Sequence, residues 1–327
     1  MTAVTWLHLS DLHFREKHAW DEDIVLRALL RDVEECEGDY GLKPDLVLVS
    51  GDIAFSGTSY EYSLAQSFFD DLLDVTGLPK ERLFLVPGNH DVNRRSISSG
   101  AKAIVSSCDS RRKINEALDD ETDRRLVLRK FDSYADFINR YCSHISFDDQ
   151  SYFYVRSLSL DDQRIAILGI NSAWLSCDDN DRNHLAIGEK QVREILGSSQ
   201  GADLTIAVLH HPFEWLQDPD REVCESLLMD RCDFVLCGHR HRSGLLLQRT
   251  PDARAIHITA GTCYQAREYS NGYNFVRIDL ETLRGKVFLR AWSNRQTGFW
   301  TKDVQTHRNV ENGEYPFSIR EETQWCE

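Results

Sequence analysis

Long apolar segments and closely spaced cysteine pairs are both absent from this sequence of 327 residues. No run approaches the roughly 20 apolar residues that cross a bilayer. The start MTAVTWLHLS lacks the basic leader of a signal peptide and predicts a first β-strand. Proline and glycine are scarce, no internal repeat is visible, and no stretch has the composition of a disordered tail. We therefore expect a soluble, cytoplasmic protein that binds no membrane and has enough apolar material for one large domain or two modest ones.

The nine cysteines form no C-x-x-C pair, and several lie within apolar runs, as Cys237 does in DFVLCGH. This pattern favours buried, reduced thiols over a disulfide framework or a zinc–thiolate site. The formal net charge of −15 disfavours broad electrostatic adhesion to nucleic acid or to an anionic membrane. A local positive pocket is still compatible with it, because bound metal ions can dominate the field of a site.

Short apolar runs rich in valine, isoleucine and leucine recur along the chain and have the length of buried strands. Helical periodicity lies between several of them: residues 25–36 form one apolar face interrupted by Asp32, and residues 65–73 form another. Strands that alternate with helices predict an α/β fold with a largely buried sheet. The predicted strands are Val4–Leu9, Leu46–Val49, Leu83–Val86, Ile165–Ile170, Leu204–Leu209, Phe234–Cys237 and Ile256–Thr259.

Toward the C-terminus helices give way to strands, and Asn274–Leu280 and Lys286–Trp292 resemble a hairpin. We therefore expect a mixed or antiparallel sheet there. The domain is predicted to span residues 1–300, and the polar residues 301–327 are predicted to form a C-terminal arm or the stub of a linker.

Residues 93 to about 150 break this alternation and predict a helical insertion. A single apolar stripe at helical spacing would dock the insertion on the domain: Val127, Phe131, Tyr134, Ile138 and Tyr141. Basic clusters lie in or beside it at Arg111–Lys113, Arg124–Arg125 and Arg129–Lys130. The favoured interpretation is that these charges form a solvated face. The alternative is that the insertion is a cap that helps to hold an extended phosphate substrate.

Metal-capable side chains directly follow five of the predicted strands. The segments are Ser10-Asp11-Leu12-His13, Ser50-Gly51-Asp52, Pro87-Gly88-Asn89-His90-Asp91, His210-His211-Pro212 and Gly238-His239-Arg240-His241. Open α/β sheets build their sites at the carboxyl ends of strands, so these side chains are expected to converge at one sheet edge. Each motif alone is weak evidence, whereas all five in this order indicate a metal site.

The series D-x-H, G-D, G-N-H-D, H-H-P and G-H-x-H resembles the calcineurin-like metallophosphoesterase superfamily over about residues 4–292, apart from the insertion. The resemblance implies a four-layer α/β/β/α sandwich of two mixed sheets flanked by helices, with two metal ions at the strand ends. By the same resemblance, Asp52 bridges the two ions. The remaining ligands would be Asp11, His13 and His241 for one ion, and Asn89, His210 and His239 for the other.

The donor set supports two divalent ions on chemical grounds. Carboxylate, amide and imidazole ligands without thiolate suit manganese, iron or zinc, and manganese is our first choice. Two divalent ions with the carboxylates of Asp11 and Asp52 and a bridging hydroxide keep a net charge of about +1, so the cluster still attracts an anionic phosphoryl group. Such a pair of ions can activate water and stabilise a phosphoryl transition state.

Residues beside the ligands are candidates for catalysis and substrate binding. His90, by resemblance, points toward substrate and is expected to stabilise the phosphoryl charge or to protonate the leaving oxygen. Asp91 is predicted to act by orienting the loop or a neighbouring group, and a plain structural role is an equal alternative. His211 is expected to lie beside a metal ligand without binding the metal itself. The candidate substrate contacts are Asn89, His90, His211 and Arg240, although a surface position is the default for Arg240.

Phe55 narrows the choice of subfamily, because it stands three residues after Asp52. Purple acid phosphatases, which the chain resembles, need a tyrosine there, so a tyrosinate-bound ferric ion is not expected. Serine/threonine protein phosphatases carry an aspartate at this position, and double-strand-break repair nucleases place a histidine near it. The segment GDIAFSG has neither. The pattern is most similar to class III cyclic-nucleotide phosphodiesterases and their relatives.

Our first hypothesis is therefore hydrolysis of a nucleotide-type phosphodiester by a metal-bridging hydroxide, with a cyclic nucleotide as one candidate substrate. The first alternative is a metal-dependent nuclease that grips a DNA or RNA strand with the arginines of the insertion. The second is a scaffold that keeps the fold without catalysis. The C-terminal arm and the insertion are candidate sites for a protein partner.

Overall fold

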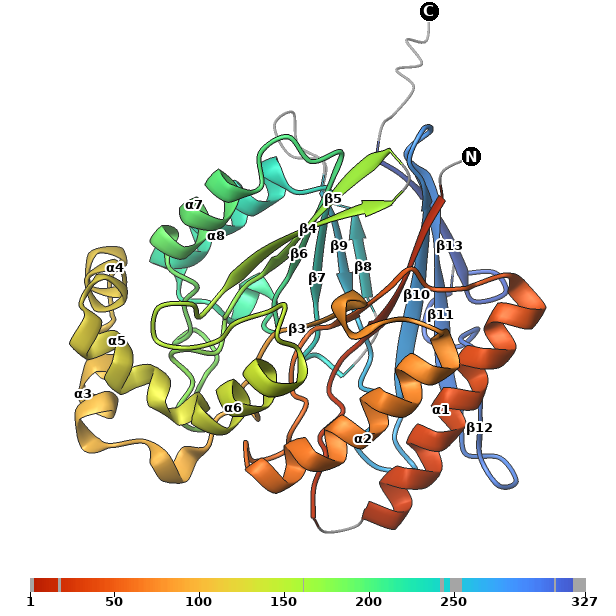
Figure 1. Ribbon diagram of the computed structural model, residues 1–327, viewed down its shortest axis with the longest axis horizontal. Coiled ribbons are helices and arrows are strands. Elements are labelled where there is room, and N and C mark those ends of the chain that lie inside the picture. Colours follow the sequence, from red (N-terminus) through yellow and green to blue (C-terminus); the bar gives the residue numbers. More distant parts are fainter. Residues whose placement is uncertain are drawn as a thin grey trace, which may run out of the picture.

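The computed structural model describes residues 3–16, 19–160, 162–241, 244–247, 255–308 and 310–319. Two mixed β-sheets pack face to face, and helices cover their outer faces (Figure 1). The predicted four-layer α/β/β/α sandwich is therefore confirmed. Within these ranges, no helix combines the length and the apolar character needed to cross a membrane.

The first sheet carries the strands at both ends of the chain. Its elements and the helices that cover it are β1 (Ala3–Leu9), α1 (Ala19–Tyr40), β2 (Leu46–Val49), α2 (Ser59–Thr76), β3 (Leu83–Leu85), β10 (Gly272–Asp279), β11 (Arg284–Ser293), β12 (Phe299–Lys302) and β13 (Glu314–Ser318). The strand order is β12-β11-β10-β1-β2-β3, and β13 also pairs with β11. β1, β2 and β3 are parallel, whereas β10 and β11 form the predicted antiparallel hairpin.

The second sheet is built from the middle of the chain. Its elements and their helices are β4 (Tyr154–Leu160), β5 (Gln163–Gly169), α7 (Glu189–Ser198), β6 (Leu204–Val208), α8 (Asp218–Arg231), β7 (Phe234–Cys237), β8 (Gly244–Leu247) and β9 (Ile256–Thr259). The order β4-β5-β6-β7-β9-β8 has four parallel strands at its centre and an antiparallel strand at each edge.

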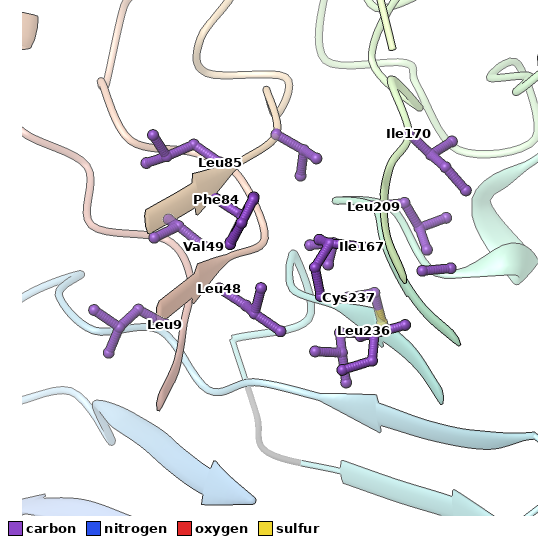
Figure 2. Packing of buried hydrophobic residues seen from close by; sticks show 14 of the residues in the cluster. Leu9, Leu48, Val49, Phe84, Leu85, Ile167, Ile170, Leu209, Leu236 and Cys237 are labelled. Carbon is purple, nitrogen blue, oxygen red and sulfur yellow. The ribbon is translucent and has the colours of Figure 1, made fainter. Parts of the chain in front are cut away.

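The core lies between the two sheets. Figure 2 shows Leu48 of β2 and Phe84 of β3 on one side, opposite Ile167 of β5 and Leu236 of β7. All four side chains are fully buried. Because both faces of the central strands are covered, these strands have continuous apolar sequences without polar alternation, and this made them predictable.

Asp32, the polar residue on the apolar face of α1, joins a buried polar group. Its carboxylate accepts hydrogen bonds from the hydroxyl of Tyr273 at 2.5 Å and from the Nε of Arg290 at 2.8 Å. The second guanidinium nitrogen of Arg290 also contacts it. The buried carboxylate of Asp32 is thus paired with the guanidinium of Arg290 and the hydroxyl of Tyr273, and these contacts link α1 to β10 and β11.

Four α-helices confirm the predicted helical insertion: α3 (Ser99–Ser107), α4 (Arg111–Asp119), α5 (Glu121–Leu128) and α6 (Asp132–Tyr141). All five residues of the predicted apolar stripe are buried. Most of the basic clusters form exposed ion pairs, such as Arg112 with Glu116 and Arg125 with Glu121. This agrees with the solvated-face interpretation.

Two residues of the basic clusters differ from that interpretation, because Arg124 and Lys130 are buried. The guanidinium of Arg124 donates to the carbonyl of Leu118 at 2.6 Å. The ammonium of Lys130 donates to the carbonyls of Trp174 and Ser176, each at 2.6 Å. Lys130 therefore links the insertion to the loop that follows β5 through two buried hydrogen bonds.

Replacing Lys130 by methionine is expected to destabilise the protein by about 2–4 kcal/mol, because two buried carbonyls would lose their donor. Urea unfolding followed by circular dichroism would measure this loss. The matched control is Lys113→Met, which removes only an exposed ion pair with Asp109 and should cost less than about 0.5 kcal/mol. Equal stability of the two variants would contradict the anchoring role of Lys130.

Part of the predicted C-terminal arm belongs to the first sheet, which corrects the boundary at residue 300. β13 pairs with β11 from Glu314↔Phe288 to Ser318↔Arg284, and Phe317 and Ile319 are buried. β13 is short and contains Pro316, which lowers its strand signal although an edge strand accommodates it. Residues 320–327 of the predicted arm lie outside the described residues.

Eight of the nine cysteines lie in the part of the chain that the structure describes, and all eight are free thiols. Seven are buried, and Cys177 is partly exposed. The expectation of free thiols is confirmed for these eight, and the expectation of burial for the seven other than Cys177.

Candidate metal centre

The loops that follow β1, β2, β3, β6 and β7 bring the seven predicted ligands together at one edge of the sandwich. Ligand atoms of Asp11, Asp52 and His210 lie within 4.8 Å of one another, as do those of Asp11, His13 and His241. Asn89 and His239 join the same group through contacts with His210. The expected convergence of the strand ends is therefore seen. That these side chains bind metal stays a prediction.

The backbone at this edge adopts a conformation that most residues avoid. Nine non-glycine residues among those described have positive φ, and five of the nine are predicted ligands: Asp11, His13, Asp52, His239 and His241, with φ between 52° and 66°. Left-handed backbone at non-glycine positions is costly and concentrates at functional sites.

The first half of the centre is organised around Asp11. Its Oδ2 accepts hydrogen bonds from the hydroxyl of Ser10 at 2.6 Å and from the backbone N–H of His239 at 3.1 Å. Its Oδ1 is buried without a hydrogen-bond donor, although the Nε2 of His241 lies 3.1 Å away. The Nδ1 of His241 lies 2.7 Å from the Oε1 of Gln265 and donates to it, so the Nε2 lone pair faces the carboxylate.

The second half is organised around His210. Its Nδ1 donates to the carbonyl of Ser50 at 2.7 Å, which leaves an Nε2 lone pair. Around this Nε2, each at 3.2 Å, lie the Oδ2 of Asp52, the Oδ1 of Asn89 and the Nδ1 of His239. The Oδ2 of Asp52 is also buried without a donor.

In both halves, carboxylate oxygens and imidazole nitrogens approach one another at short distances, and a cation or a proton between them stabilises this arrangement. A tetrahedral ion with bonds of about 2.0–2.1 Å separates its ligand atoms by about 3.3 Å, close to the spacing around His210. The donor set is oxygen and imidazole nitrogen, without thiolate. The residues therefore fit two divalent ions such as manganese, iron or zinc.

The pKa values show at which side chains a proton would compete with a metal ion for the same lone pair. Burial lowers the pKa of His13 to about 4 and that of His239 to about 3, so both imidazoles are neutral near pH 7 with free lone pairs. Burial also acts against a charged His210, but the adjacent Asp52 carboxylate raises its pKa to about 9. A proton on His210 thus balances Asp52, and a metal ion would displace it.

Two glycines of the motifs leave room for the ligands. Gly51 has φ of +95°, and a Cβ there would lie 2.7 Å from the Nδ1 of His210. A Cβ on Gly88 would lie 2.2 Å from the Oδ1 of Asp52. Glycine is therefore required at these two positions, before Asp52 and before Asn89, because the neighbouring ligand side chains approach the backbone too closely for a Cβ.

His90 lies beside both halves of the centre. Its backbone N–H donates to the Oδ1 of Asp52 at 2.8 Å, and its Nδ1 donates to the carbonyl of Phe55 at 2.8 Å. Its ring centroid is 4.8 Å from that of His13. These contacts place the imidazole next to the predicted ligands while its Nδ1 is engaged with backbone, which leaves Nε2 for a substrate.

Asp91 is buried, and its carboxylate is used by the surrounding loops. It accepts hydrogen bonds from the backbone N–H groups of Ala54 at 2.9 Å and Gly88 at 2.8 Å, and from the hydroxyl of Tyr62 at 2.9 Å. Burial and the nearby Asp52 charge raise the pKa of Asp91 to about 6. These contacts favour the loop-orienting role over direct contact with a substrate.

His211 contacts a predicted ligand through a defined proton arrangement. The hydroxyl of Ser172 accepts from the backbone N–H groups of His210 and His211, so its own proton points to the His211 Nδ1 at 3.0 Å. The Nε2–H of His211 then donates to the Oδ1 of Asn89 at 3.2 Å. His211 thus lies beside the predicted ligand Asn89, and its ligand atom is also within 4.8 Å of those of His210 and His239, so its exclusion from the metal stays a prediction.

Arg240 is exposed, and its guanidinium forms an ion pair with Glu214. This contact agrees with the default interpretation of a surface arginine. A substrate contact by Arg240 stays a prediction that the geometry does not favour.

A cavity of about 800 Å³ opens beside His90 and contains functional candidates that the sequence patterns did not indicate. Arg15, Arg94 and Arg95 line it together with Phe55. The predicted basic clusters of the insertion do not line it, because only residues 93–95 at the start of that segment reach the cavity. Arg15 is isolated in the sequence, and only the three-dimensional arrangement of the loops shows that it belongs to the site.

The comparisons with known proteins point to one family. The calcineurin-like phosphoesterase family matches residues 4–243. The chain is 24% identical over 329 residues to the uncharacterized metallophosphoesterase-like protein YydB of Bacillus subtilis (strain 168), which covers 97% of this chain and 65% of that protein. The chain therefore spans slightly less than two thirds of the length of this relative.

Two further likenesses are more limited. Over 85 residues the chain is 38% identical to the glycerophosphodiester phosphodiesterase GpdQ of Enterobacter lignolyticus (strain SCF1), covering 26% of this chain and 28% of that protein. The purple acid phosphatase PPD1 of yellow lupin (Lupinus luteus) is similar in structure, with a TM-score of 0.52 and 11% identity over 92% of this chain and 54% of that one. This second likeness concerns the fold alone.

The family match extends from β1 through the last of the five ligand motifs, and it agrees with the arrangement of two sheets and the convergent ligands. Because the match covers most of the chain, the protein belongs to the calcineurin-like phosphoesterase family.

Proposed function

We propose that this protein is a two-metal-dependent phosphodiesterase that acts on a nucleotide-type substrate. One observation carries the proposal: buried carboxylate and imidazole groups converge at one edge of the sandwich, and Asp52 is grouped both with Asp11 and His210 and with His13 and His90. Membership of the calcineurin-like phosphoesterase family supports metal-dependent phosphoester hydrolysis as the reaction class.

In the proposed site, Asp11, His13 and His241 hold one divalent ion, and Asn89, His210 and His239 hold the other. Asp52 contributes to both. Manganese is the first choice. When bound, the two ions would activate water and neutralise charge that develops on the phosphoryl group.

The residues around the ligands would hold the ligand loops in place and supply a proton to the leaving oxygen. The imidazole of His90 is held through its Nδ1 by the carbonyl of Phe55, which leaves Nε2 for the substrate; as an imidazolium, the ring can donate from Nε2 a hydrogen bond to a phosphoryl oxygen or a proton to the leaving oxygen. Asp91 holds the loop that carries Asn89 and His90. His211 fixes the amide of Asn89.

Two observations support a diester over a monoester. Phe55 is 40% exposed in the cavity beside His90, so an apolar surface is available for a second ester substituent. The relative GpdQ is named as a glycerophosphodiester phosphodiesterase, and its likeness to this chain is 38% identity over 85 residues.

Reconstitution with manganese is expected to give hydrolysis of bis(p-nitrophenyl) phosphate that is faster than hydrolysis of p-nitrophenyl phosphate. Removal of metal by a chelator should lower this activity by about 10³-fold and should also lower the melting temperature, since metal that binds only the folded state stabilises it by about 4 kcal/mol at a thousandfold excess over Kd. Metal analysis, an absorbance assay and thermal unfolding would measure these effects. A protein that binds two ions and cleaves neither ester would be a scaffold, contrary to the proposal.

A further inference from the structure

A second cavity, of about 810 Å³, lies on the other side of the metal centre from the His90 cavity. We call it the His241 cavity. It is lined by His241 and by residues in or beside β10, β11 and β12, among them Asn271, Arg295, Phe299 and Lys302. The lining residues of the two cavities do not overlap.

The sheet order places the metal centre between these cavities. β1 lies between β10 and β2, and the loop after β1 carries His13. The His13 ring is 4.8 Å from the ring of His90 and 5.5 Å from that of His241, so it separates the two sides by about one side chain. The His90 cavity extends toward the loops after β2 and β3, and the His241 cavity extends toward β11 and β12.

The two cavities offer similar chemistry. Each has a large, partly exposed aromatic ring: Phe299 is 44% exposed, and Phe55 is 40% exposed, with the Arg15 guanidinium 4.7 Å from its ring centroid. Each also has an exposed arginine with no ion-pair partner among the described residues: Arg95 in the His90 cavity and Arg295 in the His241 cavity. Aromatic faces with cations are the surface on which the bases and the backbone of single-stranded nucleic acids bind.

Acidic groups offset this charge: the three arginines of the His90 cavity are matched by Glu16, Glu61 and Asp179, whereas the two basic residues of the His241 cavity are matched by Asp303 alone. In the His90 cavity, Asp179 pairs with Arg94, and the Glu61 carboxylate accepts hydrogen bonds from the backbone of Ser56 and Thr58. Glu16 also lines the cavity and is exposed. In the His241 cavity, Asp303 is buried, and its carboxylate accepts hydrogen bonds from backbone N–H groups.

We infer that the substrate is a linear phosphodiester of the dinucleotide or short single-stranded oligonucleotide class, with one base in each cavity and the scissile phosphate between them. The inference rests on the proposed phosphodiesterase function, and it favours a linear phosphodiester over a cyclic mononucleotide as the substrate. A cyclic mononucleotide has one base and closes both ester bonds on one sugar, so it fills one cavity only. In the reaction, the oxygen of water forms a bond to phosphorus, one ester P–O bond breaks, and the leaving oxygen takes a proton, giving one phosphomonoester and one alcohol.

The experiment compares three substrates with the manganese-loaded protein: the dinucleotide TpT, cyclic thymidine monophosphate, and the small diester methyl p-nitrophenyl phosphate. We expect kcat/KM for TpT to exceed that for the cyclic nucleotide at least about tenfold, since the stacking of one base contributes roughly 5- to 150-fold. Phe55→Ala and Phe299→Ala should each lower the ratio of kcat/KM for TpT to that for the small diester by a factor in this range. The control Tyr60→Ala, an aromatic residue that is 56% exposed on α2 and lines neither cavity, should leave the ratio unchanged.

Each outcome separates the inference from the function on which it rests. Faster cleavage of the cyclic nucleotide than of TpT would overturn the inference and leave phosphodiesterase activity standing. If Phe299→Ala is folded and leaves the ratio of kcat/KM for TpT to that for the small diester unchanged, the inference is likewise overturned while phosphodiesterase activity stands. If the loaded protein cleaves no diester at all, including the small one, the proposed function fails, and the inference fails with it.

Discussion

Asp52→Asn is expected to lower kcat/KM for a phosphodiester by about 10³-fold or more, which corresponds to about 4 kcal/mol of transition-state stabilisation. The ligand atom of Asp52 is grouped with Asp11 and His210 and also with His13 and His90, so this one carboxylate serves both halves of the centre. Asparagine has nearly the same volume and keeps one oxygen, but it removes a negative charge that both ions would share. The metal content should therefore fall from two ions per chain to one or fewer.

Metal analysis and steady-state kinetics on the same preparation would test this expectation. The matched control is Asp23→Asn, which removes an exposed carboxylate whose partner is Arg27 on α1 and should change neither metal content nor activity. A variant at position 52 that keeps two ions and full activity would contradict the bridging role of Asp52.

His90→Ala is expected to lower kcat by about 10²- to 10⁴-fold, the usual effect of losing a general acid, while the metal content stays at that of the unmodified protein. The imidazole is held by the carbonyl of Phe55 and is not among the seven predicted ligands, so the metal centre should survive the change. If His90 protonates the leaving oxygen, its loss should matter most for diesters with a poor leaving group. It should matter least for p-nitrophenolate, which leaves without a proton.

The dependence of kcat on the leaving-group pKa would separate this role from a structural one. A steeper dependence in the His90→Ala variant supports proton donation, whereas an equal loss for all leaving groups would contradict proton donation and leave stabilisation of the phosphoryl charge or support of the loop. The control His184→Ala removes an exposed histidine whose Nδ1 contacts the backbone of residues 180 and 182, and it should leave kcat unchanged.

The central fold could be predicted because its signal is local. β2 and β7 are buried on both faces and therefore appear as continuous apolar runs, and the ligand motifs follow those runs directly. β4 was not predicted, because it is an edge strand in which buried and exposed residues alternate. β13 was not predicted either, because Pro316 and the polar sequence around it conceal a strand that only its pairing with β11 stabilises.

The metal-capable residues could be predicted from their spacing, but the rest of the site could not. Arg15 follows the first ligand motif, and Arg295 and Phe299 lie close together near the end of the chain, but none of the three carries a motif. Arg295 and Phe299 come near the centre only because β10, β11 and β12 extend the sheet beside β1. The charge clusters that were visible in the insertion instead pair with nearby acids or support the insertion from within.

The left-handed backbone at five of the ligands has a consequence for how a ligand can be deleted. Aspartate, asparagine and histidine tolerate positive φ better than most residues, so the loop conformation and the metal favour the same side chains. Alanine at His241, where φ is 53°, would remove the imidazole and strain the loop at once, and the two losses would be indistinguishable. Glycine adopts this φ freely and leaves a gap of the shape of the missing ring. Glycine is thus the substitution that empties a coordination position while preserving the loop, and imidazole supplied in solution is the ligand of the right shape to fill it.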